Sequence, residues 1–210
     1  MATNWRILGI SGPKGGGKDT VFKMIETLCP LSVKRFAFAD KLKNELVSEL
    51  KLDGDILHKG TTLEKDTTLT GYTWDSPQYE QFNPKGAKTG FITYREMMCI
   101  WGEMKGTSYW VSKLLGDIYD YLEEDSDHIA IVTDVRYPEE VTALRYSGAD
   151  LIKIEATSEG TIDYKHSSEN TDILEYDYLL KGRGKASLSE TKAALRDIMW
   201  SALGVNCHGK

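Results

Sequence analysis

The sequence is poor in cysteine and has no long apolar run. Its 210 residues include only Cys29, Cys99 and Cys207, and no two of them form a C-x-x-C pair. An odd number of widely spaced cysteines without metal-ligand spacing argues against a disulfide framework and favours reduced thiols. No apolar stretch approaches the roughly 20 residues that cross a membrane, and no apolar signal region opens the chain. We therefore expect a cytoplasmic protein that does not enter membranes.

The sequence also lacks an excess of basic residues. Lysine and arginine number 26 against 32 aspartates and glutamates, which gives a formal net charge of -6. A long nucleic-acid footprint needs a basic face, so we expect no nucleic acid polymer as a partner. A small phosphorylated substrate remains compatible, because a few local cations can outweigh the overall charge. The length suits one α/β domain, residues 1–210, with a substrate-binding insertion.

A glycine-rich stretch carries the strongest functional signal. Its residues are Gly12, Pro13, Lys14, Gly15, Gly16, Gly17, Lys18, Asp19 and Thr20. An apolar run at 7–10 predicts a buried strand before it, and the apolar spacing at 21–28 predicts a helix after it. In that context a G-x-x-x-x-G-K pattern indicates a phosphate-binding loop, because glycines let the backbone wrap round phosphate oxygens and the helix start adds positive charge. Lys18 would then reach the outer phosphates. The alternative is a glycine-rich turn that binds nothing.

Strand and helix patterns alternate along the rest of the chain. We expect strands at 33–38, 128–133, 151–154 and 176–180, and helices at 40–52, 94–104, 108–122, 138–147 and 188–203. Ser187 and Glu190 fit a capping box for the last helix. Such alternation predicts an α/β fold with a parallel sheet that helices cover on both faces.

Residues 53–92 interrupt this alternation. They lack clean periodicity, and Pro77 and Pro84 would break a helix. A long irregular segment in a compact domain is often a functional loop, so we expect a substrate-binding insertion there. Its aromatic residues, unusual in so polar a segment, are Tyr72, Trp74, Tyr79 and Phe82. They either stack on a base, with Trp74 the candidate, or anchor the segment to the body.

Charged side chains follow two of the predicted strands, where open α/β sheets bind ligands. Asp40 and Lys43 follow the second strand and either contact a nucleotide or metal, or act as a helix cap and a solvated lysine. Asp134 follows the strand at 128–133. It either holds Mg²⁺ beside the phosphates on Lys18 or caps the helix at 138–147.

Arg136 lies two residues beyond Asp134. Its guanidinium suits bidentate binding of a phosphate group. The alternative is a surface ion pair with Glu139 or Glu140.

The loop ends in G-K-D-T, so the hydroxyl comes one residue later than in most phosphate-binding loops. This is similar to nucleoside monophosphate kinases, whose loops commonly read G-K-G-T, and closer still to the deoxynucleoside monophosphate kinases of bacteriophages, where G-K-D-T occurs. Further segments resemble that phage family in order and spacing. These segments are 94–102 together with 109–111, then 134–140, 166–169 (H-x-S-E) and 177–188. Cys99 and Gly182 depart from the family, which often has glutamine and asparagine there. The matches span nearly the whole chain except 53–92.

The resemblance implies a P-loop NTPase fold of the nucleoside monophosphate kinase type, with ATP as donor, Mg²⁺, and a deoxynucleoside monophosphate as acceptor. A phage enzyme would work in the host cytoplasm, and homodimer formation is left open. For the donor, the resemblance implies Gly12 to Thr20 with Arg183. For the metal it implies Asp134 and Thr20, and for the acceptor phosphate Arg95 and Arg136. Lys165 and His166 are weaker candidates for the site.

Three other classes compete with this interpretation. Another small-molecule kinase of the same fold, such as a phosphomevalonate or dephospho-coenzyme A kinase, would share the loop. A nucleotide-switched binding protein would need a guanine-selecting N-K-x-D motif, which the sequence lacks. The acidic charge and small size weigh against an ATP-driven nucleic-acid motor.

Overall fold

The computed structural model describes residues 5–13, 15–83, 86–155, 174–182 and 184–207. The chain forms two compact units. We call Met1–Phe38 with Val111–Lys210 the sheet unit, and Ala39–Trp110 the helical unit. The segment expected as an insertion, 53–92, lies inside the helical unit, which also takes in helix on both sides of it.

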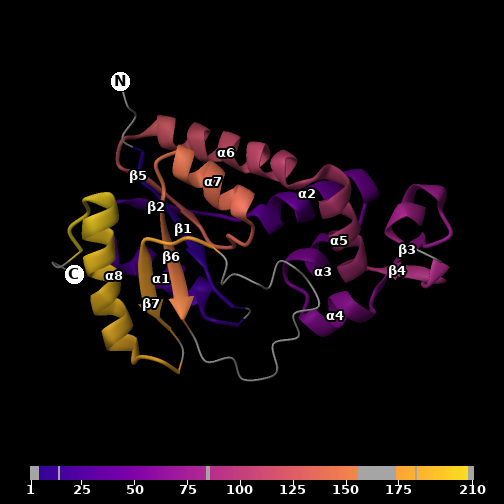
Figure 1. Ribbon diagram of the computed structural model, residues 1–210, viewed down its shortest axis with the longest axis horizontal. Coiled ribbons are helices and arrows are strands. Elements are labelled where there is room, and N and C mark those ends of the chain that lie inside the picture. Colours follow the sequence, from indigo (N-terminus) through magenta and orange to yellow (C-terminus); the bar gives the residue numbers. More distant parts are fainter. Residues whose placement is uncertain (1–4, 14, 84–85, 156–173, 183, 208–210) are drawn as a thin grey trace. The chain divides into compact units, whose positions relative to one another are not determined.

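The sheet unit is built on five parallel strands in the order β2-β5-β1-β6-β7 (Figure 1). Their bounds are β1 Ile7–Ser11, β2 Ser32–Phe36, β5 His128–Val132, β6 Asp150–Glu155 and β7 Tyr178–Lys181. All residues of β1, and residues 129–132 of β5, are buried, as expected for a parallel sheet covered on both faces. The predicted α/β class with a parallel sheet is confirmed.

Helices cover both faces of this sheet. On one face α1 (Lys18–Leu28) and α8 (Leu188–Leu203) pack against alternate strand residues such as Leu8 and Ile10. On the other lie α7 (Pro138–Tyr146) and the part of α6 (Thr107–Glu124) that belongs to this unit (Figure 1). Gly9 faces α7, and a Cβ added there would overlap Leu151 and crowd Leu144. The predicted capping box of the last helix is confirmed, because Ser187 and Glu190 bond reciprocally.

The helical unit contains more regular structure than its sequence pattern indicated. Its elements are α2 (Phe38–Leu50, from Ala39 on), α3 (Gly54–His58), α4 (Thr62–Thr67), β3 (Leu69–Thr73), the 3-10 helix η1 (Pro77–Phe82), β4 (Phe91–Thr93) and α5 (Tyr94–Lys105). The prediction that 53–92 is an irregular segment is therefore wrong. Helices of five or six residues are too short to show periodicity, and caps define them instead. Asp53 caps α3, and Thr61 with Glu64 forms a capping box for α4.

Aromatic side chains form the core of the helical unit. Trp74 is 4% exposed and Tyr79 is 1% exposed. They pack with apolar side chains that include Leu46, Leu57, Ile92 and Met97. The structure thus fits the alternative in which aromatic residues anchor the segment, and it buries the indole of Trp74 that we had considered for stacking on a base.

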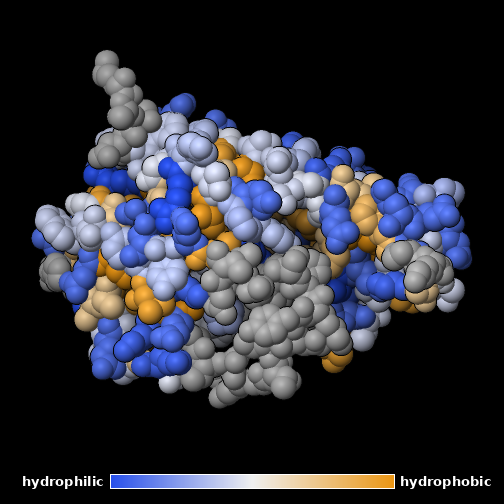
Figure 2. Space-filling model, viewed as in Figure 1, coloured by the Kyte–Doolittle hydropathy of each residue, from blue (hydrophilic) through white to orange (hydrophobic). Residues whose placement is uncertain are grey.

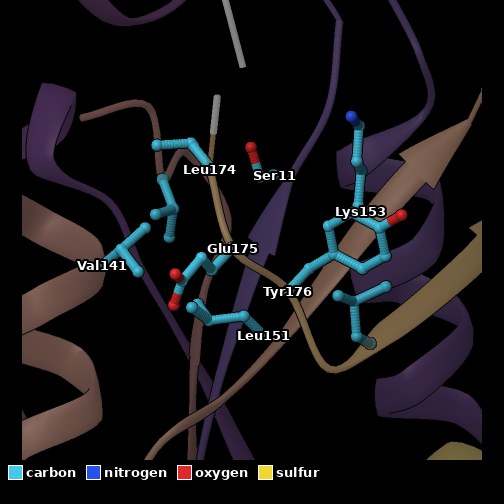
Figure 3. Close-up of a pocket in the computed structure, with 9 residues that line it drawn as sticks. Ser11, Val141, Leu151, Lys153, Leu174, Glu175 and Tyr176 are labelled. Carbon is cyan, nitrogen blue, oxygen red and sulfur yellow. The ribbon is translucent and has the colours of Figure 1, made fainter. Parts of the chain in front are cut away.

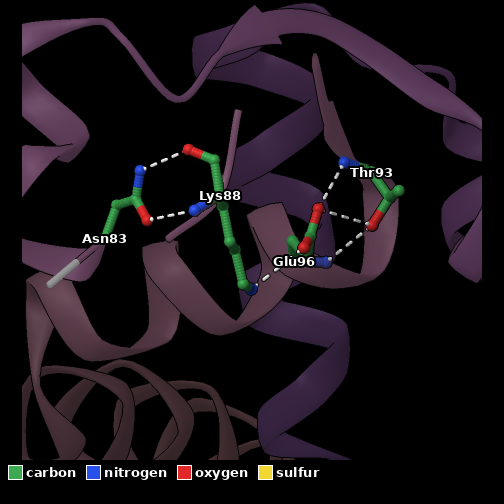
Figure 4. Close-up of polar contacts among 4 residues, drawn as sticks. All are labelled: Asn83, Lys88, Thr93 and Glu96. Atoms are coloured by element: carbon green, nitrogen blue, oxygen red, sulfur yellow. Dashed lines mark hydrogen bonds and ion pairs between the residues drawn. The ribbon is translucent and has the colours of Figure 1, made fainter. Parts of the chain in front are cut away.

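Asn83, Lys88, Thr93 and Glu96 form a polar network (Figure 4), and Lys88 places it beside Trp74. The Lys88 ammonium lies 4.5 Å from the centroid of the Trp74 ring and donates to Glu96 at 2.9 Å. The side-chain amide of Asn83 holds the backbone of Lys88, because its Oδ1 accepts from the Lys88 N–H and its Nδ2 donates to the Lys88 carbonyl. Glu96 also forms the capping box of α5 with Thr93. The network fixes the start of α5, the helix that carries Arg95.

The face of the molecule in Figure 2 is mostly hydrophilic, with apolar residues showing in small groups. Among the described residues, no helix combines the length and the apolar character that a membrane span requires.

The burial of Trp74 predicts a large stability effect. Trp74→Ala should lower the free energy of unfolding of the helical unit by about 3–5 kcal/mol, because it removes a buried indole and leaves a cavity. Urea unfolding followed by circular dichroism measures this. Trp200→Ala is the matched control, since Trp200 is 58% exposed on α8, and it should change stability by no more than about 0.5 kcal/mol. Equal, small losses in both variants would contradict the placement of Trp74.

Candidate functional site

The parallel sheet brings five strand ends to one edge. β1 lies between β5 and β6, and the chain moves from β1 first to the β2 side and later to the β6 side. The connections therefore diverge beside β1, and such a switch point at the carboxyl edge is where open α/β sheets bind ligands. The glycine-rich stretch follows β1 at this point.

The backbone of this stretch curls into a turn that opens α1. Gly15 and Gly17 adopt φ values of 73° and 93°, a left-handed region that disfavours any residue with a Cβ. The N–H of Gly16 donates to the Pro13 carbonyl at 3.0 Å, and the N–H of Val21 donates to the Gly17 carbonyl at 2.9 Å. Among the residues that the structure describes, nothing lies within 4 Å of a Cβ built at Gly15 or Gly17, so these residues leave the turn open on that side. An open glycine turn at a helix N-terminus suits the close approach of a phosphate.

Lys18 is the first residue of α1, and its side chain returns to the loop. Its ammonium donates to the carbonyls of Gly12 at 2.8 Å and of Pro13 at 2.9 Å. The two bonds hold the ammonium against the loop backbone. The lysine thus adds a cation to a turn already suited to an anion.

The loop is packed tightly against the strands behind it. A Cβ added to Gly12 would lie 3.0 Å from both the Cβ and the carbonyl oxygen of Ile154 at the end of β6. A Cβ added to Gly182, just after β7, would lie 3.2 Å from the Gly16 carbonyl and 2.7 Å from Ile154. Gly182, one of the two departures from the phage family, is therefore a site of close backbone approach.

Two loop residues predicted from the family spelling lie near the surface. Asp19 forms a 3.7 Å ion pair with Arg35, and its side chain is 80% exposed. Exposed pairs of this kind add little stability. Thr20 is exposed in the first turn of α1.

Asp134 comes two residues after β5 and caps a helix, although not the expected one. Its Oδ1 accepts a hydrogen bond of 2.9 Å from the N–H of Phe38, the first residue of α2. The N-cap of α7 is Tyr137, so the cap predicted for Asp134 at 138–147 is wrong. A second correction follows for Asp40. The helix begins two residues earlier than predicted, so Asp40 lies inside its first turn and accepts from Lys43 at 3.0 Å instead of capping it.

The donor chemistry of Asp134 suits a hard cation. Among the described residues, no group of three or more histidine, cysteine, aspartate or glutamate side chains could hold a metal by itself. Mg²⁺ in phosphoryl-transfer sites is commonly held by one or two carboxylates, with substrate phosphates and water completing its shell. Asp134, at the edge that carries the glycine turn, fits that kind of site, whereas a cage made only of protein ligands does not.

Glu140 is a buried carboxyl group behind Arg136. It is 4% exposed, and its Oε2 accepts the backbone N–H groups of Arg136 at 2.7 Å and Tyr137 at 3.0 Å. The pKa of Glu140 is raised from 4.5 to about 8, mainly because the group is buried. The negative charge of Asp134 contributes to the rise, and the two N–H groups and the positive charge of Arg136 oppose it. The alternative of a surface pair with Arg136 is therefore wrong for Glu140. This residue holds the backbone that carries Arg136, and it does so mostly as the neutral acid at pH 7.

Sequence reasoning missed two buried hydroxyls near the strand ends. Within the described ranges, the Ser11 and Thr133 hydroxyls find no hydrogen-bond partner. Ser11, the residue before Gly12, lines a small, mostly apolar recess whose other walls include Val141, Leu174 and Tyr176 (Figure 3). The Lys153 ammonium lies 5.4 Å from the centroid of the Tyr176 ring at this recess. No pattern in the sequence distinguishes these hydroxyls from ordinary ones that end a strand.

The helical unit holds the other predicted residues. Arg95 lies in the first turn of α5 and donates to Asp66 of α4 at 3.1 Å. Asp40 and Lys43 lie on α2 in this same unit. Lys18, Asp134 and Arg136 all belong to the sheet unit. Lys14, Lys165, His166 and Arg183 lie outside the described residues.

Comparison with known proteins gives one distant structural match to report. No protein-family model matches the chain, and no curated protein matches its sequence. A solved structure of the tunicamycin resistance protein of Deinococcus radiodurans is similar, with a TM-score of 0.45 and 11% identity over 96% of this chain and 98% of that one. So distant a likeness shows nothing about function.

The raised pKa of Glu140 predicts a pH dependence of stability. The unfolded chain loses this proton near pH 4.5 and the folded chain near pH 8, so stability falls as the pH rises between these values. Glu140→Gln keeps an oxygen acceptor for both N–H groups and should remove on the order of 2–5 kcal/mol of that fall. Urea unfolding at pH 5, 6, 7 and 8 tests this.

Glu139→Gln, an exposed neighbour on the same helical turn, is the control and should leave the wild-type pH profile unchanged. The same decline in Glu140→Gln as in the wild type would show that Glu140 is ionised in the folded protein.

Proposed function

We propose that this protein transfers the γ-phosphoryl group of ATP to deoxynucleoside monophosphates, giving ADP and the deoxynucleoside diphosphate. The observation that carries the proposal is the strand–turn–helix at Gly12 to Thr20, with two left-handed glycines and the Lys18 ammonium at the switch point of a parallel sheet. The resemblance of the sequence to phage deoxynucleoside monophosphate kinases supports the choice of acceptor.

In this proposal the sheet unit holds the donor. The turn and the N-terminus of α1 present backbone N–H groups to the β- and γ-phosphates, and Lys18 supplies a positive charge to the same oxygens. Asp134 and Thr20 would hold Mg²⁺, which would neutralise charge on those phosphates. Asp134 is held in place for this by the N–H of Phe38.

Arginine side chains hold the acceptor in the same proposal. Arg136 serves from the sheet unit, on a backbone that Glu140 fixes. Arg95 is the other arginine proposed for the acceptor phosphate, and Asp66 orients its guanidinium. A guanidinium suits this task because its fork matches two phosphate oxygens at once.

The reaction needs no protein nucleophile. An oxygen of the acceptor phosphate attacks the γ-phosphorus of ATP, and the bond from that phosphorus to the bridging oxygen of ADP breaks. Catalysis by this chain would consist of positioning the two phosphates in line and stabilising their charge. The cationic residues above supply both effects.

A coupled ADP-release assay with each deoxynucleoside and ribonucleoside monophosphate tests the function. We expect turnover with at least one deoxynucleoside monophosphate. Turnover should fall at least about 100-fold in Lys18→Ala, the size typical of removing one electrostatic contact to the transition state, while the circular dichroism spectrum is kept. Release with phosphomevalonate or dephospho-coenzyme A alone would move the chain to another kinase class. Release with no acceptor at all would refute the proposal.

Asp134 allows its metal role to be separated from its capping role. Asp134→Asn keeps an oxygen that can accept the N–H of Phe38 but removes the charge, so activity should fall by about 100-fold with stability nearly kept. Asp134→Ala should lose the same activity and also about 0.5–2 kcal/mol of stability, because the cap is gone. Turnover titrated with Mg²⁺ and thermal unfolding measure the two effects. An active Asp134→Asn variant with an unchanged Mg²⁺ titration would leave Asp134 only its structural role.

A further inference from the structure

The helical unit collects cationic side chains from four of its helices. Lys43 comes from α2, His58 from α3, Lys65 from α4 and Arg95 from α5. The short helices hold the group together, because α4 packs against both α3 and α5. We call these four residues the cation cluster. Neither His58 nor Lys65 follows from any motif in the sequence.

Carboxylates compensate only half of the cation cluster. Lys43 pairs with Asp40 at 3.0 Å, and Arg95 pairs with Asp66 at 3.1 Å. In the part of the chain that the structure describes, the side chains of His58 and Lys65 have no carboxylate within ion-pair distance. The cluster therefore keeps a net positive charge when Lys65 is protonated.

The positive charges in the cluster repel one another, and this adds to partial burial in lowering the pKa values of Lys65 and His58. Partial burial lowers the pKa of Lys65, and the positive charges of Lys43 and Arg95 lower it further against a weak opposing effect of Glu64. Partial burial also lowers the pKa of His58. Lys43, Lys65 and Lys59 lower it further, and Asp40 opposes them. Partial burial and the neighbouring lysines therefore disfavour the protonated form of His58 more than Asp40 favours it, and an added anion among these side chains would favour that form.

We propose that Lys43, His58, Lys65 and Arg95 form a binding site for a dianionic phosphate group, and that His58 takes up one proton from solvent when the site fills. The assignment of this phosphate to the acceptor rests on the proposed function. The site itself rests on this group of basic side chains, in which Lys65 and His58 have no carboxylate partner among the described residues. Because binding is coupled to proton uptake, the affinity of the site for the phosphate group increases as the pH falls.

The four histidines of the chain allow a direct test by nuclear magnetic resonance. The His58 ring resonance, assigned with His58→Gln, is titrated between pH 5 and 8 with and without sulfate. Sulfate is the probe because it stays dianionic across this range, so any pH dependence belongs to the protein. We expect saturating sulfate to raise the pKa of His58 by about one unit, as for an opposite charge within contact distance. In a Lys18→Ala background, which removes the loop as a competing anion site, sulfate affinity should rise by up to about tenfold from pH 7.5 to 5.5.

Two lysine variants make the test specific. Lys65→Gln should raise the pKa of His58 in sulfate-free protein and weaken the response to sulfate several-fold. Lys59→Gln is the matched control, because Lys59 adjoins His58 in sequence but is 80% exposed and paired with Asp55. Lys59→Gln should raise the pKa of His58 in sulfate-free protein less than Lys65→Gln does, because Lys59 has the smallest effect of the three lysines. It should leave the response to sulfate nearly unchanged. A His58 pKa that sulfate does not move, or equal effects of the two variants, would overturn the site.

Further arms separate this inference from the proposed function. A deoxynucleoside monophosphate should raise the pKa of His58 as sulfate does, and the unphosphorylated deoxynucleoside should not. A response to sulfate or inorganic phosphate, with none to any nucleotide and no ADP release, would keep the anion site and refute the kinase proposal. ADP release with an unresponsive His58 would keep the kinase and refute the site.

Discussion

Parallel pairing of the five strands is the constraint on which the sheet unit depends. Parallel neighbours cannot be joined by tight hairpins, so their connections cross a face of the sheet, and α1, α7 and the end of α6 lie in such connections. All carboxyl ends then meet at one edge. The glycine turn, Asp134 and the backbone of Arg136 come together there although more than a hundred residues separate the turn from the other two.

Charge is handled differently in the two units. In the sheet unit the buried Glu140 keeps its proton at neutral pH, so a carboxyl group can brace a backbone next to Asp134 without adding a second negative charge. In the helical unit, cations stay close together with only part of their charge offset by Asp40 and Asp66. Both arrangements shift pKa values from their ordinary range, that of Glu140 upward and those of His58 and Lys65 downward. Shifted pKa values are common in sites that bind or transform charged ligands.

The sheet unit was predictable from the sequence because its signals are local. Apolar runs gave the strands, glycines gave the turn, and Ser187 with Glu190 gave the start of α8. Three features were not local. The cap on Phe38 comes from Asp134, 96 residues away. Glu140 belongs to a helical turn whose charged residues suggest solvent, and only the fold buries it. The helical unit is made of elements too short for periodicity, so its cation cluster and the burial of Trp74 became visible only in three dimensions.

Gly182, just after the last strand, packs its backbone closely against the glycine turn. Its N–H continues the ladder of β6 by donating to the Glu155 carbonyl at 2.8 Å, and it leaves no room for a side chain beside Gly16 and Ile154. In an evolutionary record this position should therefore behave like a member of the loop, intolerant even of alanine, although 166 residues of sequence separate it from Gly16. A search for ligand-contacting residues would overlook it, and random mutagenesis would find it.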